Sequence, residues 1–129
     1  MRVLVVDDDP NIRGLVQDNF LSLDHEVRSA ASGREALALL DKYTPDIVVT
    51  DRRMPEMNGE ELIGRIKETK PHLLIFFVLM TGDDLSPAER SVARAAGVDE
   101  IITKPFSEEK LEKVIDEAAA RISSAPSSS

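Results

Sequence analysis

The chain has 129 residues, a net charge of −8 and no cysteine. This length favours one domain with a proper core, and the negative charge argues against direct binding to nucleic-acid phosphates or anionic membranes. Without cysteine there is no disulfide and no thiolate metal site. Met1 runs almost directly into a strand-like stretch and the longest apolar run covers residues 73–80, so we expect neither a signal peptide nor a membrane span.

Apolar runs that stop at polar residues predict five strands, at residues 3–6, 25–30, 47–51, 73–80 and 100–103. Amphipathic segments between and after them predict five helices. Residues at helical spacing that we expect to face the core include Leu15 in the first helix, Tyr43 in the second and Val92 in the fourth. Expected helix caps are Ser32–Glu35, Asn58–Glu61 and Ser86–Glu89, with Gly97 ending the fourth helix.

Strands alternating with helices predict a doubly wound α/β fold, with a five-stranded parallel sheet and helices on both faces. Alternation alone does not give the strand order. We expect the domain to cover residues 1–122 and the Ser-rich residues 123–129 to form a flexible tail or the start of a linker.

Polar residues follow four of the five predicted strands. Asp7 and Asp8 follow the first, Asp51 ends the third, Thr81 follows the fourth and Lys104 follows the fifth. Parallel strands place their carboxyl ends at one edge of the sheet, where α/β proteins collect their chemistry. We therefore expect three carboxylates, a hydroxyl and an ammonium group to converge there.

Such a group restricts the chemistry. Three close carboxylates repel one another unless a cation joins them, and oxygen ligands without His or Cys suit Mg²⁺. A carboxylate beside Mg²⁺ can attack a phosphoryl donor and form an aspartyl-phosphate. Lys104 and Thr81 would then bind the phosphoryl oxygens.

The pattern closely resembles the receiver domain of two-component response regulators, of the chemotaxis-regulator kind. The resemblance covers residues 1 to about 122. It is carried by Val5-Val6-Asp7-Asp8-Asp9-Pro10, Asp51-Arg52-Arg53-Met54-Pro55-Glu56-Met57-Asn58-Gly59, Thr81-Gly82, Ala95-Ala96-Gly97-Val98 and Lys104-Pro105-Phe106.

The resemblance implies a cytoplasmic signalling switch with the flavodoxin-like strand order 2-1-3-4-5. It implies that Asp51 accepts a phosphoryl group from a histidine kinase or histidine phosphotransfer protein. Asp7, Asp8 and the backbone carbonyl of Arg53 would join Asp51 as Mg²⁺ ligands, and Thr81 would be the switch hydroxyl. The Lys104-Pro105 peptide is expected to be cis.

A donor histidine must approach Asp51 in line. We therefore expect the phosphodonor to dock on the segments around it, through Asn11, Ile12, Leu15, Pro105 and Phe106. The output is expected from the surface formed by the fourth helix, fifth strand and fifth helix. In this sequence no helix-turn-helix or catalytic domain follows residue 122, which fits either a single-domain regulator or one cut in the Ser-rich linker. We expect the partner to be a downstream protein or an output domain, and not nucleic acid or membrane.

Three positions are notable within the family pattern. The family often carries an aromatic ring three residues before the lysine, where this chain has Ile101, so we expect the switch to work through Thr81. Arg53 and Asp83 occupy two positions around the site, and an ion pair between them is one expectation; two solvated side chains are the other.

Three other functions are compatible with an α/β domain of this kind but fit the sequence less well. A receiver-like interaction module without phosphorylation would not need this intact set of site residues. A Mg²⁺-dependent aspartyl phosphatase would need a second aspartate two residues after Asp51, where Arg53 stands. A flavin or nucleotide binder would need a phosphate-binding loop after the first strand, where residues 7–9 are all acidic. A switch that catalyses only its own phosphorylation and dephosphorylation fits best.

Overall fold

The computed structural model describes residues 1–104 and 106–124. Its strands are β1 (Arg2–Val6), β2 (Glu26–Ala30), β3 (Ile47–Asp51), β4 (Phe76–Thr81) and β5 (Glu100–Thr103). Its helices are α1 (Pro10–Ser22), α2 (Gly33–Leu39), α3 (Gly59–Thr69), α4 (Pro87–Ala96) and α5 (Glu108–Ser124). Strands and helices alternate as the sequence predicts.

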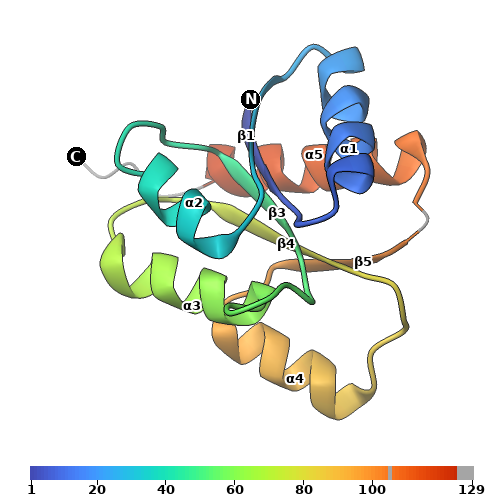
Figure 1. Ribbon diagram of the computed structural model, residues 1–129. Coiled ribbons are helices and arrows are strands. Elements are labelled where there is room, and N and C mark those ends of the chain that lie inside the picture. The colour runs from blue at the N-terminus through green and yellow to red at the C-terminus, as the bar shows by residue number, and fades with distance from the viewer. Residues whose placement is uncertain (105, 125–129) are drawn as a thin grey trace.

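The five strands form one sheet in the order β2-β1-β3-β4-β5, and every pairing is parallel. This confirms the predicted doubly wound fold and the strand order 2-1-3-4-5. Figure 1 shows α1 and α5 on one face of the sheet and α2, α3 and α4 on the other. All strands therefore end at the same edge, and the loops that follow them form one rim.

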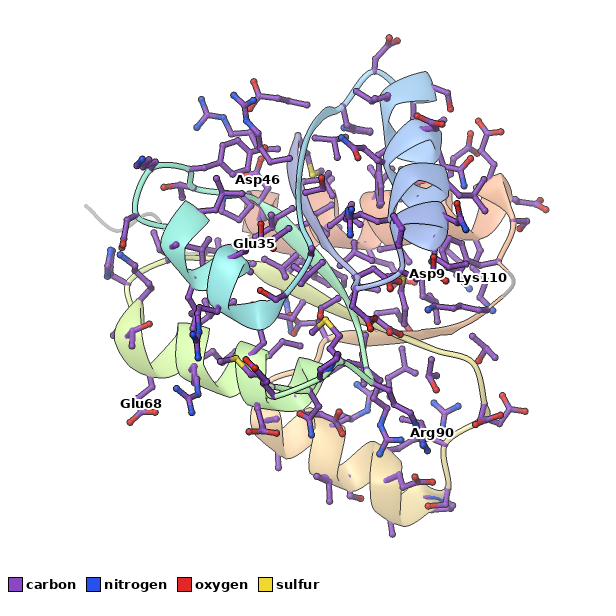
Figure 2. The ribbon with its side chains drawn as sticks, viewed as in Figure 1. Asp9, Glu35, Asp46, Glu68, Arg90 and Lys110 are labelled. Atoms are coloured by element: carbon purple, nitrogen blue, oxygen red, sulfur yellow. The ribbon has the colours of Figure 1, made fainter. Side chains whose placement is uncertain are left out.

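The sheet separates two apolar cores. In β1, Leu4 and Val6 belong to the core beneath α2, α3 and α4, whereas Val3 and Val5 belong to the core beneath α1 and α5. All four are fully buried, because successive side chains of a strand point to opposite faces and both faces are covered. Of the charged residues labelled in Figure 2, Asp46 is partly exposed and the other five are exposed.

Local signals set the helix ends. In each predicted capping pair the first side chain accepts the backbone N–H of the second; the pairs are Ser32–Glu35, Asn58–Glu61 and Ser86–Glu89. The last two are complete capping boxes, with the glutamate returning a hydrogen bond. Gly97 has a φ of 114° and ends α4, a backbone conformation that other residues rarely adopt.

Several details of the predicted elements are wrong. Leu15 and Val92 are 58% and 61% exposed, because only the narrower stripes that include Val16 and Ala93 reach the sheet. Tyr43 is buried but lies beyond α2, just after the turn that follows the helix end. The second and fourth strands begin later than predicted, at residues 26 and 76.

Helix α5 continues to Ser124, and residues 125–129 of the predicted tail lie outside the described residues. In the part of the chain that the structure describes, no helix is both long and apolar enough to cross a membrane.

Ile101 offers a test of the core beneath α4. It is 7% exposed, pairs with Leu79 in the neighbouring strand and belongs to the same core as Ala93. We expect Ile101→Ala to lower the free energy of unfolding by about 2–4 kcal/mol, through lost burial and a residual cavity. Urea denaturation followed by circular dichroism measures this. The exposed Val92→Ala control should change it by less than about 0.5 kcal/mol; equal losses would contradict the assigned packing.

Candidate functional site

The predicted site residues converge at the carboxyl edge of the sheet. Asp7 and Asp8 directly follow β1, Asp51 and Thr81 end β3 and β4, and Lys104 directly follows β5. Parallel pairing of β1 with β3, β3 with β4 and β4 with β5 places these four strand ends side by side. Residues nearly a hundred positions apart are therefore neighbours.

Lys104 forms the ionic centre of this group. Its Nζ lies 3.0 Å from Oδ1 of Asp51 and 3.3 Å from Oδ2 of Asp7, and donates a hydrogen bond to each. The Asp7 side chain is fully buried, and those of Asp51 and Lys104 are 13% and 22% exposed. One ammonium group thus bridges two carboxylates in a largely dry place, where ion pairs are screened least.

The environment displaces two pKa values in the same direction. Burial raises the pKa of Asp7, and the nearby charge of Asp51 adds to this, against the hydrogen bond from the Asp9 N–H and the charge of Lys104. Burial alone would lower the pKa of Lys104, but hydrogen bonds and charges from Asp51 and Asp7 outweigh it and raise that pKa. Lys104 is therefore a permanent cation at neutral pH, and ionised Asp7 is held at a cost.

The carboxylates of Asp7, Asp8 and Asp51 form a compact oxygen cluster. One oxygen from each lies within 4.8 Å of the other two. The side chains of Asp7 and Asp51 are buried or nearly so, while Asp8 is exposed. The cluster is therefore open to solvent on the side of Asp8. A hard divalent cation such as Mg²⁺ fits this donor set, because it prefers oxygen ligands and retains several waters.

Thr81 lies at the end of β4 and is 4% exposed. Its hydroxyl donates to the Asp83 carbonyl at 2.9 Å and accepts the Asp83 N–H at 3.2 Å. The hydroxyl is therefore satisfied by its own loop, and a group that recruits it as a donor must displace its bond to the Asp83 carbonyl.

The loop after β1 fixes the buried aspartate. Asp7 Oδ1 accepts the Asp9 N–H at 3.0 Å, and the Arg13 guanidinium donates to the Asp7 carbonyl at 2.8 Å. The Asp9 side chain caps α1 by accepting from Asn11 and Ile12. Of the three consecutive aspartates, two thus join the oxygen cluster and the third starts a helix.

The family profile described as "Response regulator receiver domain" matches residues 3–116. The chain belongs to this family. Transcriptional regulatory protein TrcR of Mycobacterium tuberculosis is 36% identical over 111 residues, which are 86% of this chain and 42% of TrcR.

Two solved receiver structures have the same fold. The chemotaxis protein CheY4 of Vibrio cholerae is 32% identical, with a TM-score of 0.84, over 91% of this chain and 97% of CheY4. The BeF3-activated DrrB receiver domain is 30% identical, with a TM-score of 0.80, over 93% of this chain and 97% of that one. Receiver domains are signalling switches of two-component phosphorelays.

Gly59 lets this receiver domain pack α3 against the end of β3. A Cβ at this position would lie 2.5 Å from the backbone oxygen of Asp51 and 2.7 Å from Leu79 Cδ1. The Gly59 N–H donates to the Arg52 carbonyl at 2.9 Å and closes the loop between β3 and α3. Any larger residue would push α3 away from the site.

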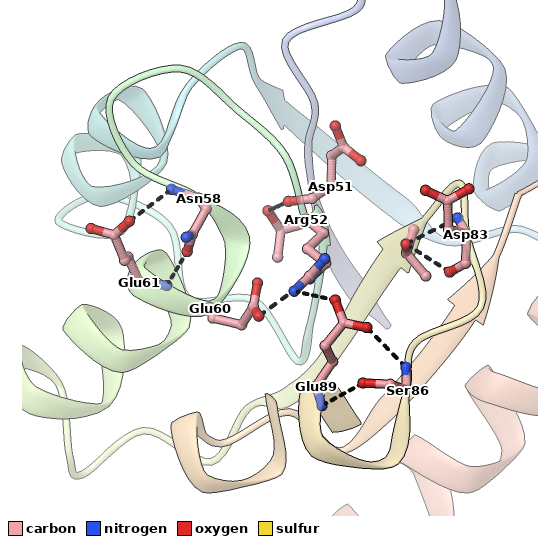
Figure 3. A network of polar contacts seen from close by, with 10 residues as sticks. Asp51, Arg52, Asn58, Glu60, Glu61, Asp83, Ser86 and Glu89 are labelled. Atoms are coloured by element: carbon pink, nitrogen blue, oxygen red, sulfur yellow. Dashed lines mark hydrogen bonds and ion pairs between the residues drawn. The ribbon is translucent and has the colours of Figure 1, made fainter. Parts of the chain in front are cut away.

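Sequence reasoning missed Arg52. Its guanidinium lies between Glu60 of α3, at 3.3 Å, and Glu89 of α4, at 3.4 Å (Figure 3). The pattern Asp51-Arg52-Arg53 holds no signal for these partners, because they meet Arg52 only when α3 and α4 pack side by side. By contrast, no ion pair joins the exposed Arg53 to Asp83 among the described residues. The idea that such a pair shields the site is not supported.

Three of the predicted docking residues line one pocket. Ile12, Leu15 and Phe106, together with Val16 and Lys104, surround a cavity of about 310 Å³ beside the ionic centre. Asn11 is exposed at the start of α1. Pro105, and with it the expected cis peptide, lies outside the described residues.

The raised pKa of Asp7 predicts a pH-dependent stability. Because the folded pKa lies above the ordinary value of 3.8, ionised Asp7 costs stability at any pH above both values. Below about 3.8 both states are protonated and the cost is gone. In metal-free buffer, Asp7→Asn should therefore be more stable than the wild type at neutral pH. This advantage should shrink as the pH falls through the raised pKa.

Urea denaturation between pH 7.5 and 4 with a chelator tests this expectation. Asp9→Asn is the matched control: it also removes one charge, but from an exposed residue, and asparagine still caps the helix. An Asp7→Asn advantage that stays constant with pH would show that the buried carboxylate is not its source.

Proposed function

We propose that this receiver domain is a phosphorylation-activated switch in which Asp51 accepts a phosphoryl group from a histidine kinase or a histidine phosphotransfer protein. The observation that carries the proposal is the Lys104 ammonium group, 3.0 Å from the Asp51 carboxylate and 3.3 Å from that of Asp7. An ammonium group in that place attracts a phosphoryl oxygen as the group arrives. The domain then catalyses only its own phosphorylation and dephosphorylation.

The transfer is a substitution at phosphorus. A carboxylate oxygen of Asp51 bonds to the phosphorus of a phosphohistidine while the P–N bond breaks, and the leaving imidazole nitrogen keeps the electron pair and takes a proton from water. The 13% exposure of the Asp51 side chain limits the approach to the open rim of the sheet. Hydrolysis later returns Asp51 to a carboxylate, with water as the attacking group.

We assign a Mg²⁺ site to Asp7, Asp8 and Asp51, with the backbone carbonyl of Arg53 as a further ligand. When bound, the ion would neutralise charge on the phosphoryl oxygens during transfer. The oxygen cluster within 4.8 Å supports the assignment. The task of the chain is to hold three carboxylates together in advance, with Lys104 offsetting part of their repulsion.

Phosphorylation would engage Thr81. The phosphoryl group brings roughly two negative charges and three acceptor oxygens. Lys104 already neutralises one side of Asp51, so the Thr81 hydroxyl is the nearby uncharged donor that can turn inward. It would give up its two hydrogen bonds to Asp83 and draw the loop before α4 with it.

The output surface is then formed by α4, β5 and α5. Val92 is 61% exposed on α4, whereas Ile101 is buried in β5 and stays with the core. A downstream protein or an attached output domain would recognise this surface. The chain spans 42% of TrcR, a transcriptional regulatory protein, so any contact with nucleic acid would belong to another part of a longer protein.

Acetyl phosphate tests the function directly. With Mg²⁺ present, the intact mass should rise by one phosphoryl group, and Asp51→Asn should lack the adduct. With the chelator in place of Mg²⁺, we expect the yield to fall at least tenfold. An equal adduct on Asp51→Asn would refute Asp51 as the acceptor, and no adduct on the wild type would refute the switch.

Docking makes a second prediction. Leu15 is 58% exposed and lines the pocket beside Lys104, whereas Leu21 is 49% exposed on the same helix but does not line it. Leu15→Ala should slow transfer from a phosphorylated histidine phosphotransfer domain about tenfold, as truncating one apolar anchor does. Phosphorylation by acetyl phosphate should be unchanged.

Leu21→Ala, with a similar loss of exposed apolar surface, should leave both rates unchanged. If both variants slow transfer equally, α1 does not dock the donor through this pocket. A Leu15→Ala protein that is slow with acetyl phosphate too would place the damage in the site itself.

A further inference from the structure

Arg52 connects the start of α4 to the loop of residues 52–58, which follows Asp51 and is called the acceptor loop below. Arg52 Nε lies 3.3 Å from Glu60 Oε2, and Arg52 Nη2 lies 3.4 Å from Glu89 Oε2 (Figure 3). The side chains of Arg52 and Glu60 are 18% and 12% exposed, and that of Glu89 is 43% exposed. The ion pair of Arg52 with Glu60 on α3 is thus well shielded, and its ion pair with Glu89 on α4 is partly open to solvent.

The backbone of Arg52 is fixed on both sides. Its N–H donates to the Met80 carbonyl at 2.8 Å, and its carbonyl accepts the Gly59 N–H at 2.9 Å. Because Asp51 immediately precedes it, the guanidinium has an anchor at the acceptor site. The backbone from which the side chain extends is therefore held by β4 and by the start of α3, and not by α4.

Helix α4 itself buries little apolar surface. Ala93 is its one buried residue, and Val92 beside it points to solvent. Alanine buries little apolar area, so the hydrophobic contribution to docking this helix is small. Leu85 and Val98, which flank the helix, are buried in the same core as Ala93. Between them, a polar contact at the first turn adds to what holds the helix in place.

Glu89 joins this contact to the helix end. Its Oε1 accepts the Ser86 N–H at 2.9 Å, and the Glu89 N–H donates to Ser86 Oγ at 3.1 Å. Its other oxygen faces Arg52. The hydrogen bonds of Ser86, and then the charges of Arg52 and Arg53, lower the pKa of Glu89 and keep it ionised. The same carboxylate thus caps α4 and ties it down.

We propose that Arg52 is a positioning residue that holds the first turn of α4 against the acceptor loop in the unphosphorylated state, and so sets how readily the switch moves. The proposal rests on the proposed function. When Thr81 leaves Asp83, residues 82–86 are drawn toward the site, and the capping box carries that displacement to Glu89. The contact with Arg52 is made in one state and weakened in the other, which is the differential interaction that a two-state switch requires.

Two capping-box glutamates provide a matched pair of variants. Glu89→Gln removes the charge that faces Arg52 but retains the capping box, because glutamine serves at the same position. Glu61→Gln makes the same change in the capping box of α3, where the glutamate pairs with Asn58 and not with Arg52. Any effect of the capping box itself should be similar in both.

In the unphosphorylated protein, Glu89→Gln should speed hydrogen exchange of the α4 amides about two- to fivefold, the effect of losing one partly exposed ion pair. Its α4 amide resonances should also move toward the positions that they take in the beryllofluoride-bound wild type. Arg52→Gln should have the same two effects on α4. The Arg52→Gln/Glu89→Gln double variant should show no larger effect than either single variant. Arg52→Lys should show a smaller effect than Arg52→Gln, because lysine keeps the positive charge but not the guanidinium geometry. Glu61→Gln should leave α4 unchanged.

Equal hydrogen exchange of the α4 amides in the Glu89→Gln and Glu61→Gln proteins would show that the Arg52–Glu89 ion pair does not hold α4. Faster exchange without movement toward the activated resonances would leave Arg52 a purely structural role and overturn the coupling. Exchange is measured without phosphate, so a wild type that accepts no phosphoryl group would refute the proposed function while the exchange result still reports on the tie.

Discussion

The ammonium group of Lys104 between two carboxylates is the interaction on which the site depends. Asp7, Asp8 and Asp51 hold oxygens within 4.8 Å of one another, and Asp7 is fully buried. Three such charges would repel strongly in a place shielded from water. Lys104 reduces this repulsion without filling the side that Asp8 leaves open, so the cluster persists while remaining able to bind a cation.

The parallel sheet brings those four side chains together. They come from the ends of β1, β3 and β5, and in a parallel sheet all these ends lie at one edge. A parallel sheet needs helices on both faces, and this explains why residues 3–6 are buried on both sides. The polar rim is thus built on two apolar cores, and Gly59 lets α3 approach that rim closely.

The sequence could predict the features that depend on local turn chemistry or on the positions of the strand ends. The capping pairs, the stop at Gly97 and the meeting of Asp51 with Lys104 follow from turn chemistry and from the common edge of parallel strands. The exposure of Leu15 and Val92 could not be predicted, because helical spacing marks an apolar stripe but not how much of it the neighbouring layer covers. Arg52 was missed because its partners depend on how two helices pack.

These differences bear on how the receiver can switch. A buried Ile101 has no ring to move, and its core position resists movement. In the proposed switch, the change of state would therefore be carried by groups with alternative polar partners. Thr81 is one: its hydroxyl is bonded within its own loop, and in the proposed switch it would exchange those bonds for phosphoryl oxygens. Arg52 is another, because Glu60 would keep the guanidinium paired when Glu89 leaves. Arg52 would thus release α4 while its guanidinium stays paired with Glu60, so no poorly solvated charge is left without a partner. The free energies of the unphosphorylated and phosphorylated conformations would then stay close.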